Sequence, residues 1–376
     1  MIDTIVLTLT KDLFHINDPD AFKPSAQWIN APHHKNYSNI QSKQNPTKKD
    51  LINGNYKPRL TLANVINLRG KYEPLLRIEL SLPKLVYGNN FYELQYKDFK
   101  QVTERLAAIL ATMGVVIDVT TLAHAPVSAI HYAKNIPLTD GSTPYHYIQK
   151  IKEAQTHASL DVNQTDYRNE GHSYRWHCNS YEVVFYDKIR DLEQAKQSNK
   201  RALEKDNDIQ LHLLKKFKSR KNLEFLRMEV RLNKRAKMKQ LFYKLNIKAD
   251  LTFKKLFKPA IAKKVLLHYL DEIESKRAPI LNFKHVDDKE FLADLAFNNP
   301  DIKPKQALLL FGIKKALEVA TLRELQNIFT KSDKQGWTRF TKDMQLMELP
   351  TQDLPFKAIK ESLEKFKPVM PKSIDI

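Results

Sequence analysis

The chain has 376 residues, of which 42% are hydrophobic, enough for at least one substantial buried core and roughly two domains. Its formal charge of +19 points to a polyanionic partner, nucleic acid rather than a membrane surface, and residues 188–264 alone contain 24 Lys or Arg against 8 Asp or Glu. A single cysteine, Cys178, excludes an intramolecular disulfide and a cysteine zinc cluster within the chain, and no apolar window of about 18–20 residues indicates membrane insertion, so we expect a soluble cytoplasmic protein.

The first third of the chain alternates between strand and helix patterns. The N-terminus predicts a strand with Ile5, Leu7 and Leu9 on its buried face, whereas polar residues 17–60 predict an irregular excursion or loose hairpin. Alternation over residues 74–82 predicts a second strand that ends at a proline. Apolar residues at helical spacing predict an amphipathic helix over residues 97–113.

The middle of the chain predicts further strands before a change to helices. We expect a strand pair over residues 115–122 and 126–136, a helix over 144–158, and a hairpin over 172–188 that turns near Cys178. A charged helix over residues 189–221 would connect this hairpin to a strand over 223–234. The pattern beyond is helical, in stretches over 236–246, 251–275, 288–296, 304–317, 320–330 and 353–366.

These elements predict an α+β protein with an antiparallel sheet. The helices between the strands are too polar on one face for a doubly wound sheet. The boundary falls near residue 235, which gives an α+β domain over residues 1–235 and a helical, basic domain over 236–376.

Two segments place reactive side chains at every second position, which puts them on one face of a strand. Tyr186 and Lys188 share a face in 181-YEVVFYDK-188, and Arg227, Glu229 and Arg231 share a face in 223-LEFLRMEVRLNK-234. A tyrosine has a pKa of about 10, so it needs cations or a metal nearby to act as a nucleophile. With 15 Tyr in the chain, spacing alone favours the simpler interpretation, a half-buried strand tyrosine with a salt-bridged lysine.

Three residues are candidate metal ligands. Glu229 faces away from an apolar strand face, so we expect it on a polar or solvent-facing surface, as a metal ligand or in a ladder of ion pairs. Glu79 repeats the arrangement on the strand over residues 74–82, and two such strands side by side would bring the carboxylates together. His131 would add a nitrogen ligand for Mg²⁺ or Mn²⁺, although a lone strand histidine is usually structural.

Aromatic residues among basic ones form another candidate feature, because aromatic rings stack on the bases of single-stranded DNA. Trp176 and Tyr174 belong to this group, and core packing explains them equally well. The chain has only 8 Gly and no phosphate-binding glycine loop, which argues against chemistry driven by ATP.

The order of these motifs resembles that of phage and plasmid replication initiators. The start MIDTIVLTL, 77-RIELSLPKLVYGNNFYEL-94, 127-VSAIHYAKNI-136, NSYEVVFYDK ending at Lys188 and 224-EFLRMEVRL-232 are similar to the filamentous-phage gene II family. The resemblance covers roughly residues 1–235. It implies a nicking endonuclease that starts rolling-circle replication.

What the resemblance implies for the site is a tyrosine that becomes joined to a 5′ phosphate and leaves a 3′ hydroxyl. The Tyr-x-Lys motif is Tyr186 with Lys188, and related plasmid initiators carry the nucleophile on the preceding strand, where Tyr174 lies. The family commonly has Asp where this chain has His131. Mg²⁺ or Mn²⁺ held by Glu229, His131 and Glu79 would then polarise the phosphate.

We expect origin DNA as the partner, together with a host helicase and a single-strand-binding protein. The residues expected to contact DNA are Arg227, Arg231, Lys234, Arg235 and Trp176. The alternative is a protein without catalytic activity that binds an origin through its basic region and C-terminal helices.

Overall fold

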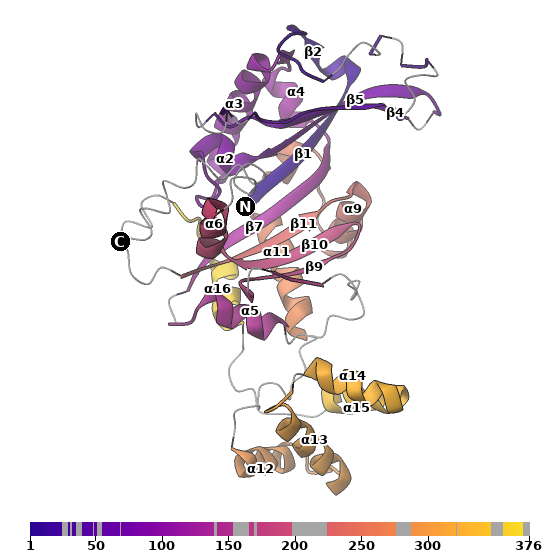
Figure 1. Ribbon diagram of the computed structural model, residues 1–376, viewed down its shortest axis with the longest axis vertical. Coiled ribbons are helices and arrows are strands. Elements are labelled where there is room, and N and C mark those ends of the chain that lie inside the picture. The colour runs from indigo at the N-terminus through magenta and orange to yellow at the C-terminus, as the bar shows by residue number, and fades with distance from the viewer. Residues whose placement is uncertain are drawn as a thin grey trace.

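The computed structural model is an α+β protein built around one large antiparallel sheet (Figure 1). It describes residues 1–24, 29–30, 32–34, 40–47, 49–50, 55–67, 69–138, 141–152, 165–168, 171–197, 224–275, 287–320, 322–346 and 356–370. The strands are β1 (Ile2–Thr10), β2 (His15–Ile16), β3 (Gln41–Gln44), β4 (Arg59–Ile66), β5 (Tyr72–Ser81), β6 (Val115–Val116), β7 (Val127–Leu138), β8 (Thr165–Arg168), β9 (Ser173–His177), β10 (Tyr181–Asp187) and β11 (Glu224–Leu232).

Within the described residues, nine strands form the sheet in the order β3-β4-β5-β1-β7-β11-β10-β9-β8, and β2 pairs separately with β6. Strand β1 alternates as the sequence predicts: Ile5, Leu7 and Leu9 are buried, while the residues between them are partly exposed. The hairpin of β9 and β10 is confirmed. The register pairs Tyr186 with Arg227 across β10 and β11, so these two side chains share a face.

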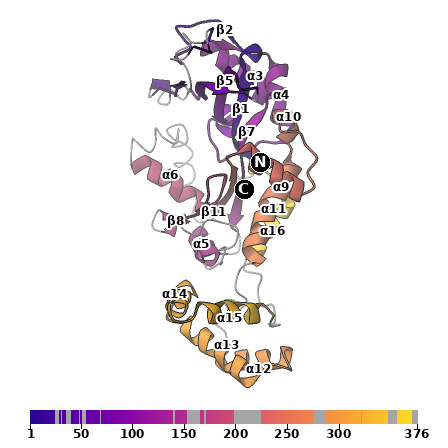
Figure 2. The ribbon, with the colours of Figure 1, turned by 90° about the vertical axis from the view of Figure 1, so that its right-hand side faces the viewer.

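The helices are α2 (Leu82–Tyr87), α3 (Phe99–Thr112), α4 (Val119–His124), α5 (Pro144–Lys152), α6 (Lys188–Gln197), α9 (Arg235–Lys244), α10 (Phe253–Leu256), α11 (Pro259–Ser275), α12 (Asp288–Asn298), α13 (Pro304–Ala316), α14 (Leu322–Ser332), α15 (Lys334–Leu346) and α16 (Lys357–Lys365). Two short 3₁₀ turns are η1 (Lys11–Leu13) and η3 (Tyr96–Asp98). Helices α9, α11 and α16 lie on one side of the sheet and α6 lies on the other (Figure 2). No helix among the described residues is long and apolar enough to span a membrane.

Two hydrophobic clusters divide the described chain. The larger one joins the apolar face of the sheet to α9, α11 and α16, and it includes Met228 of β11, Leu266 of α11 and Ile359 of α16. The smaller one joins α12 to α15 around Trp337, and these four helices lie below the sheet in Figure 1. The core of the sheet therefore continues through the helices that follow residue 235.

The structure differs from the predicted elements in several places. The strand expected over residues 115–122 is wrong: β6 has two residues, and Asp118 then begins α4 by accepting a hydrogen bond of 2.9 Å from the backbone N of Thr121. Residues 17–60, expected as an irregular excursion or a loose hairpin, contain β3 and the start of β4, and these two strands pair antiparallel as in the hairpin alternative. Elements α2, β8 and α15 had no predicted counterpart. The predicted helices over 144–158 and 189–221 are present as α5 and α6, and their remaining residues lie outside the described part.

Candidate active site

The functional site candidate is a polar cluster on the face of the sheet opposite α9, α11 and α16. The alternation that buries Leu226, Met228 and Val230 in the apolar core directs Arg227 and Glu229 to the other face. Contrary to the expected solvent-facing position, Glu229 is only 3% exposed and Arg227 only 2%. The cluster is therefore a buried arrangement of charges, which requires each charge to be paired.

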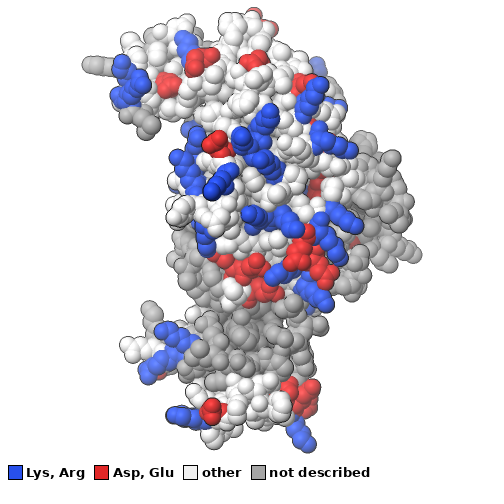
Figure 3. Space-filling model, turned by 180° about the vertical axis from the view of Figure 1, so that it is seen from behind, with Lys and Arg blue, Asp and Glu red and all other residues white. Residues whose placement is uncertain are grey.

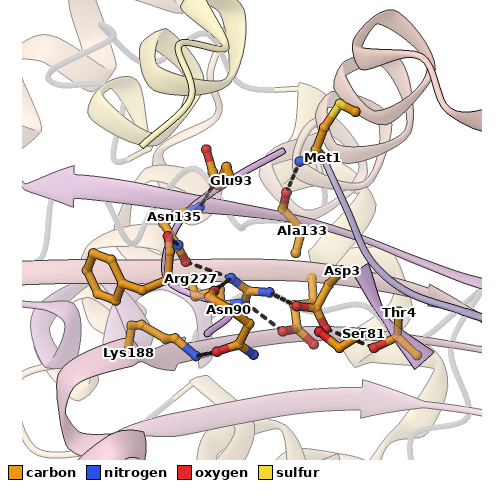
Figure 4. Close-up of polar contacts among 12 residues, drawn as sticks. Met1, Asp3, Thr4, Ser81, Asn90, Glu93, Ala133, Asn135, Lys188 and Arg227 are labelled. Atoms are coloured by element: carbon orange, nitrogen blue, oxygen red, sulfur yellow. Dashed lines mark hydrogen bonds and ion pairs between the residues drawn. The ribbon is translucent and has the colours of Figure 1, made fainter. Parts of the chain in front are cut away.

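Arg227 is the centre of the cluster. Its Nε donates to Glu229 Oε1 at 2.7 Å and its Nη2 donates to Asp3 Oδ1 at 2.7 Å. Its Nη1 donates to the backbone oxygen of Asn90 and to Asn135 Oδ1, both at 2.9 Å. Figure 4 shows Arg227 between Asp3, Asn90 and Asn135, which come from β1, the loop after α2, and β7. One guanidinium thus ties together three segments that are far apart in sequence.

Glu229 accepts four hydrogen bonds through its two carboxylate oxygens. Oε1 accepts from the Tyr186 hydroxyl and Arg227 Nε, both at 2.7 Å. Oε2 accepts from Arg231 Nε at 3.0 Å and Arg231 Nη2 at 2.8 Å. Burial alone would raise the pKa of Glu229, but Arg231 and Arg227 hold it well below its usual range. The carboxylate is therefore ionised and its lone pairs are occupied.

Tyr186 and Lys188 lie at the buried end of the cluster. Tyr186 is 8% exposed, and burial together with the charge of Glu229 raises the pKa of its phenol well above the usual value. Lys188 Nζ lies 5.7 Å from the Tyr186 ring centre and donates to Asn90 Oδ1 at 2.7 Å. Burial, reinforced by the charge of Arg227, lowers the pKa of Lys188 to about 7. At neutral pH this amine can both hold and release a proton.

The other end of the cluster opens toward solvent. The Arg231 side chain is 28% exposed, and its Nη1 donates to Glu182 Oε2 at 3.2 Å. Asn233 is exposed and donates to Glu182 Oε1 at 3.4 Å, while its amide oxygen lies 3.3 Å from His131 Nε2. Burial and the nearby Arg231 lower the pKa of His131. Of the two arginines that pair with Glu229, Arg231 is therefore the one that an incoming anion can reach first.

The structure separates the two candidate nucleophiles. Tyr174 lies opposite Phe185 in the β9–β10 hairpin, on the apolar face of the sheet, and is 5% exposed. Its ring meets Trp176 edge to face, with ring centres 4.8 Å apart. Only Tyr186 shares a face with Glu229. Trp176 is 1% exposed in the core, so the expectation that it stacks on DNA bases is wrong for this structure, because the alternation of β9 turns it inward.

The expected metal ligands do not converge. Glu79 is on β5 and Glu229 is on β11, with β1 and β7 between these strands. Strands β5 and β11 are therefore three strand spacings apart, or about 14 Å. The two strands are not side by side, which is the arrangement that convergence of the two carboxylates requires. No group of three His, Cys, Asp or Glu side chains among the described residues is placed to hold a metal ion. His131 and Glu229 lie on neighbouring strands, but the carboxylate is saturated by its donors, so this arrangement does not fit a divalent cation.

Several cluster residues were not identified from the sequence. Asp3, Asn90 and Glu182 each contact one of the cluster arginines or Lys188. A weak signal was present: Asp3 and Asn135 lie within predicted strands, where Asp and Asn are disfavoured. Lys234 and Arg235 are exposed at the start of α9 and lie outside the buried cluster.

No family model, no curated protein and no solved structure matches this chain. The resemblance to the gene II family thus stays a prediction that rests on the motifs in the sequence.

Proposed function

We propose that the protein nicks and rejoins one strand of DNA through a covalent phosphotyrosine at Tyr186. The observation that carries this proposal is the 2.7 Å hydrogen bond from the Tyr186 phenol to Glu229, a carboxylate kept ionised by two guanidiniums. A hydroxyl nucleophile with its proton acceptor already in contact is the arrangement that nucleophilic catalysis requires. We choose DNA as the substrate because of the motif order in the sequence and the formal charge of +19.

In the proposed reaction, Tyr186 Oη attacks the scissile phosphorus while its proton passes to Glu229. The bond from phosphorus to the 3′ oxygen breaks, and Lys188 protonates that oxygen. The products are a 5′ phosphate esterified to Tyr186 and a free 3′ hydroxyl. Rejoining reverses each transfer, so the phosphotyrosine bond stores the energy of the broken phosphodiester and no nucleotide cofactor is needed. The described side chains supply every proton in this scheme.

The low basicity of Glu229 in the free protein is part of this proposal. A carboxylate with a strongly lowered pKa is a poor base, and a phenol with a raised pKa is a poor nucleophile. A phosphate that binds the partly exposed Arg231 competes with Glu229 for the same donors. As those donors turn toward the phosphate, Glu229 becomes more basic and the phenol easier to deprotonate. Substrate binding therefore activates the nucleophile.

A second function is a protein that binds an origin without cutting it. The observation in its favour is the completeness of the cluster: the phenol is 8% exposed, and both Glu229 oxygens are fully engaged. A buried polar network in which every hydrogen bond is made can also serve only to fix one packing of the core. In that case the cluster holds β1, β7, β10 and β11 together, and exposed cations bind DNA.

Trapping of a covalent adduct separates the two functions. The protein is incubated with labelled single-stranded oligonucleotides of random sequence and with a supercoiled circle that carries the DNA flanking its coding region, with and without Mg²⁺ or Mn²⁺. The nicking proposal predicts a denaturant-resistant adduct and open circles for the native protein and for Tyr174→Phe, and none for Tyr186→Phe. An adduct that persists in Tyr186→Phe and disappears in Tyr174→Phe contradicts the choice of nucleophile. No adduct under any condition supports the binding protein.

A further inference from the structure

A second charged feature lies on the side of the sheet away from Tyr186. Residues 234–264 contain eleven Lys or Arg and one acidic residue, Asp250. They cover α9, α10 and the start of α11, and Figure 3 shows Lys and Arg side chains gathered across the middle of this face, with acidic side chains below them. Nine of these cations are exposed, and we call the eight of them that form no ion pair among the described residues the basic ridge: Lys234, Arg235, Lys239, Lys248, Lys254, Lys255, Lys258 and Lys264.

The ridge cations are not neutralised within the described part of the protein, where none of the eight forms an ion pair. Their neighbours behave differently. Lys244 pairs with Glu272 at 2.8 Å, and Lys237 lies 4.1 Å from the centre of the Tyr181 ring. Lys263 donates to the backbone oxygen of Glu364. The lysines that stabilise the fold are thus distinct from the eight that only add positive potential to the surface.

The charge order along α11 gives a second, independent observation. The helix dipole favours acidic residues at the N-terminus and basic residues at the C-terminus. Helix α11 has the reverse order, because Lys263 and Lys264 lie near its start while Asp271, Glu272 and Glu274 lie near its end. Its first turn holds no acidic residue and its last turn no basic one. The acidic end is accounted for within the fold, because Lys360 pairs with Asp271 at 2.9 Å and Glu274 at 3.7 Å, and Lys244 pairs with Glu272 at 2.8 Å. Lys264, near the start of the helix, has no ion pair among the described residues and can contact an anionic partner.

We propose that the basic ridge binds the sugar-phosphate backbone of double-stranded DNA, as an anchoring site separate from the Tyr186 cluster. The exposed surface of the ridge carries little apolar area: Tyr243, 88% exposed, is its one large exposed apolar side chain within the described residues. A helix that lies in a membrane surface exposes several Leu, Phe or Trp residues, and a single-strand site needs several aromatic rings. Cations without such residues match a duplex backbone.

The place of the ridge supports a role alongside nicking. Helix α9 buries Met238, Leu241 and Phe242 toward the apolar face of the sheet, so the ridge and Tyr186 lie on opposite sides. Lys234 nevertheless directly follows Asn233, which contacts Glu182 at the open end of the Tyr186 cluster. Duplex held on the ridge lies beside that open end. The choice of DNA over RNA rests on the proposed function.

The test measures binding of a labelled duplex of arbitrary sequence to Tyr186→Phe protein at several salt concentrations. If all eight cations contact phosphates, the slope of log K against log salt is about −7, and affinity falls about 2 × 10⁴-fold between about 50 and 200 mM salt. Replacing Lys254, Lys255 and Lys258 by Gln reduces the slope to about −4.5 and the fall to about 500-fold. The matched control replaces Lys289, Lys305 and Lys331, which are exposed on α12 to α14, and keeps the native slope.

Three outcomes overturn the proposal. One is an unchanged slope in the ridge variant. The second is an equal reduction of the slope in the control variant, which would mean that the effect depends only on total charge. The third is tighter binding of duplex RNA or of anionic lipid vesicles than of duplex DNA, with that binding lost in the ridge variant. Because the protein tested cannot form the Tyr186 adduct, a failure of the nicking proposal leaves this result unaffected.

Discussion

Replacement of Glu229 by Gln is the sharpest perturbation of the buried cluster. The carboxylate accepts four hydrogen bonds, three of them from the guanidiniums of Arg227 and Arg231. Glutamine keeps the size but removes the charge, and its amide nitrogen is a donor where the cluster supplies only donors. Arg227 keeps its ion pair with Asp3 at 2.7 Å, so one guanidinium stays partly compensated. Removing one partner of a buried ion pair costs about 3–5 kcal/mol.

We therefore expect Glu229→Gln to lower the free energy of unfolding of the sheet by about 3 kcal/mol, the lower end of that range. Urea unfolding followed by Trp176 fluorescence measures it, in a background where the other two tryptophans, Trp28 and Trp337, are replaced by Phe. The control is Glu79→Gln, an exposed carboxylate on the same face, for which a change within about 0.5 kcal/mol is expected.

The pH dependence of this difference follows from the lowered pKa of Glu229. A carboxyl whose pKa is lower in the folded protein stabilises it above the ordinary carboxyl pKa, and that contribution disappears only as the pH falls through the lowered value. The Glu229→Gln penalty is therefore nearly the same at pH 7 and at pH 5, and it shrinks progressively as the pH falls below the ordinary carboxyl pKa of about 4.3. A penalty as small as that of Glu79→Gln, or one already gone at pH 5, refutes the charge arrangement described for the cluster.

Three further predictions concern other parts of the molecule. Burial lowers the pKa of Lys188 to about 7, whereas the unfolded chain holds this proton to about pH 10. Between pH 7 and 9, the free energy of unfolding of the native protein should therefore rise relative to that of Lys188→Met, by up to about 1.4 kcal/mol per pH unit. Plots of the two free energies against pH that run parallel contradict this prediction. Trp176→Leu should lower the free energy of unfolding by about 2–4 kcal/mol while duplex affinity at fixed salt is unchanged, since Trp176 is a core residue. Asp287 caps α12 by accepting hydrogen bonds from the backbone N–H groups of Lys289 and Glu290. Asp287→Ala should therefore lower the free energy of unfolding of the helices around Trp337 by about 1 kcal/mol, measured by Trp337 fluorescence, and leave the unfolding midpoint reported by Trp176 unchanged.

The strands that carry the site could be predicted because their side chains alternate. Apolar residues at every second position in β1, β5 and β11 determine which side chains point into the core, and the same alternation puts Arg227 and Glu229 together. The hairpin of β9 and β10 follows from two alternating runs around Cys178. These features are local, since they depend only on residues within one or two strands.

What the sequence could not supply is the order of strands and what covers the polar face. Alternation cannot show that β1 and β7 separate β5 from β11, so Glu79 was expected beside Glu229. Nor can it show that Asp3 and Asn90 reach Arg227 from segments more than 100 residues away, which turns a face expected in solvent into a buried one. The expectation that Trp176 stacks on DNA bases failed for the same reason. Basic neighbours in the sequence do not reveal which face of the strand is buried in the core.

The position of the covalent bond to DNA tests the nicking proposal more directly than any other measurement. After adduct formation, trypsin cuts at Arg175 and Lys188, so Tyr186 is recovered in the peptide over residues 176–188 and Tyr174 in the preceding peptide. Fragmentation by mass spectrometry then assigns the nucleotide to one tyrosine. If Tyr186 is the nucleophile, a 5′-linked nucleotide is found on Tyr186. A nucleotide on Tyr174, or on Tyr181 within the same peptide, contradicts this assignment.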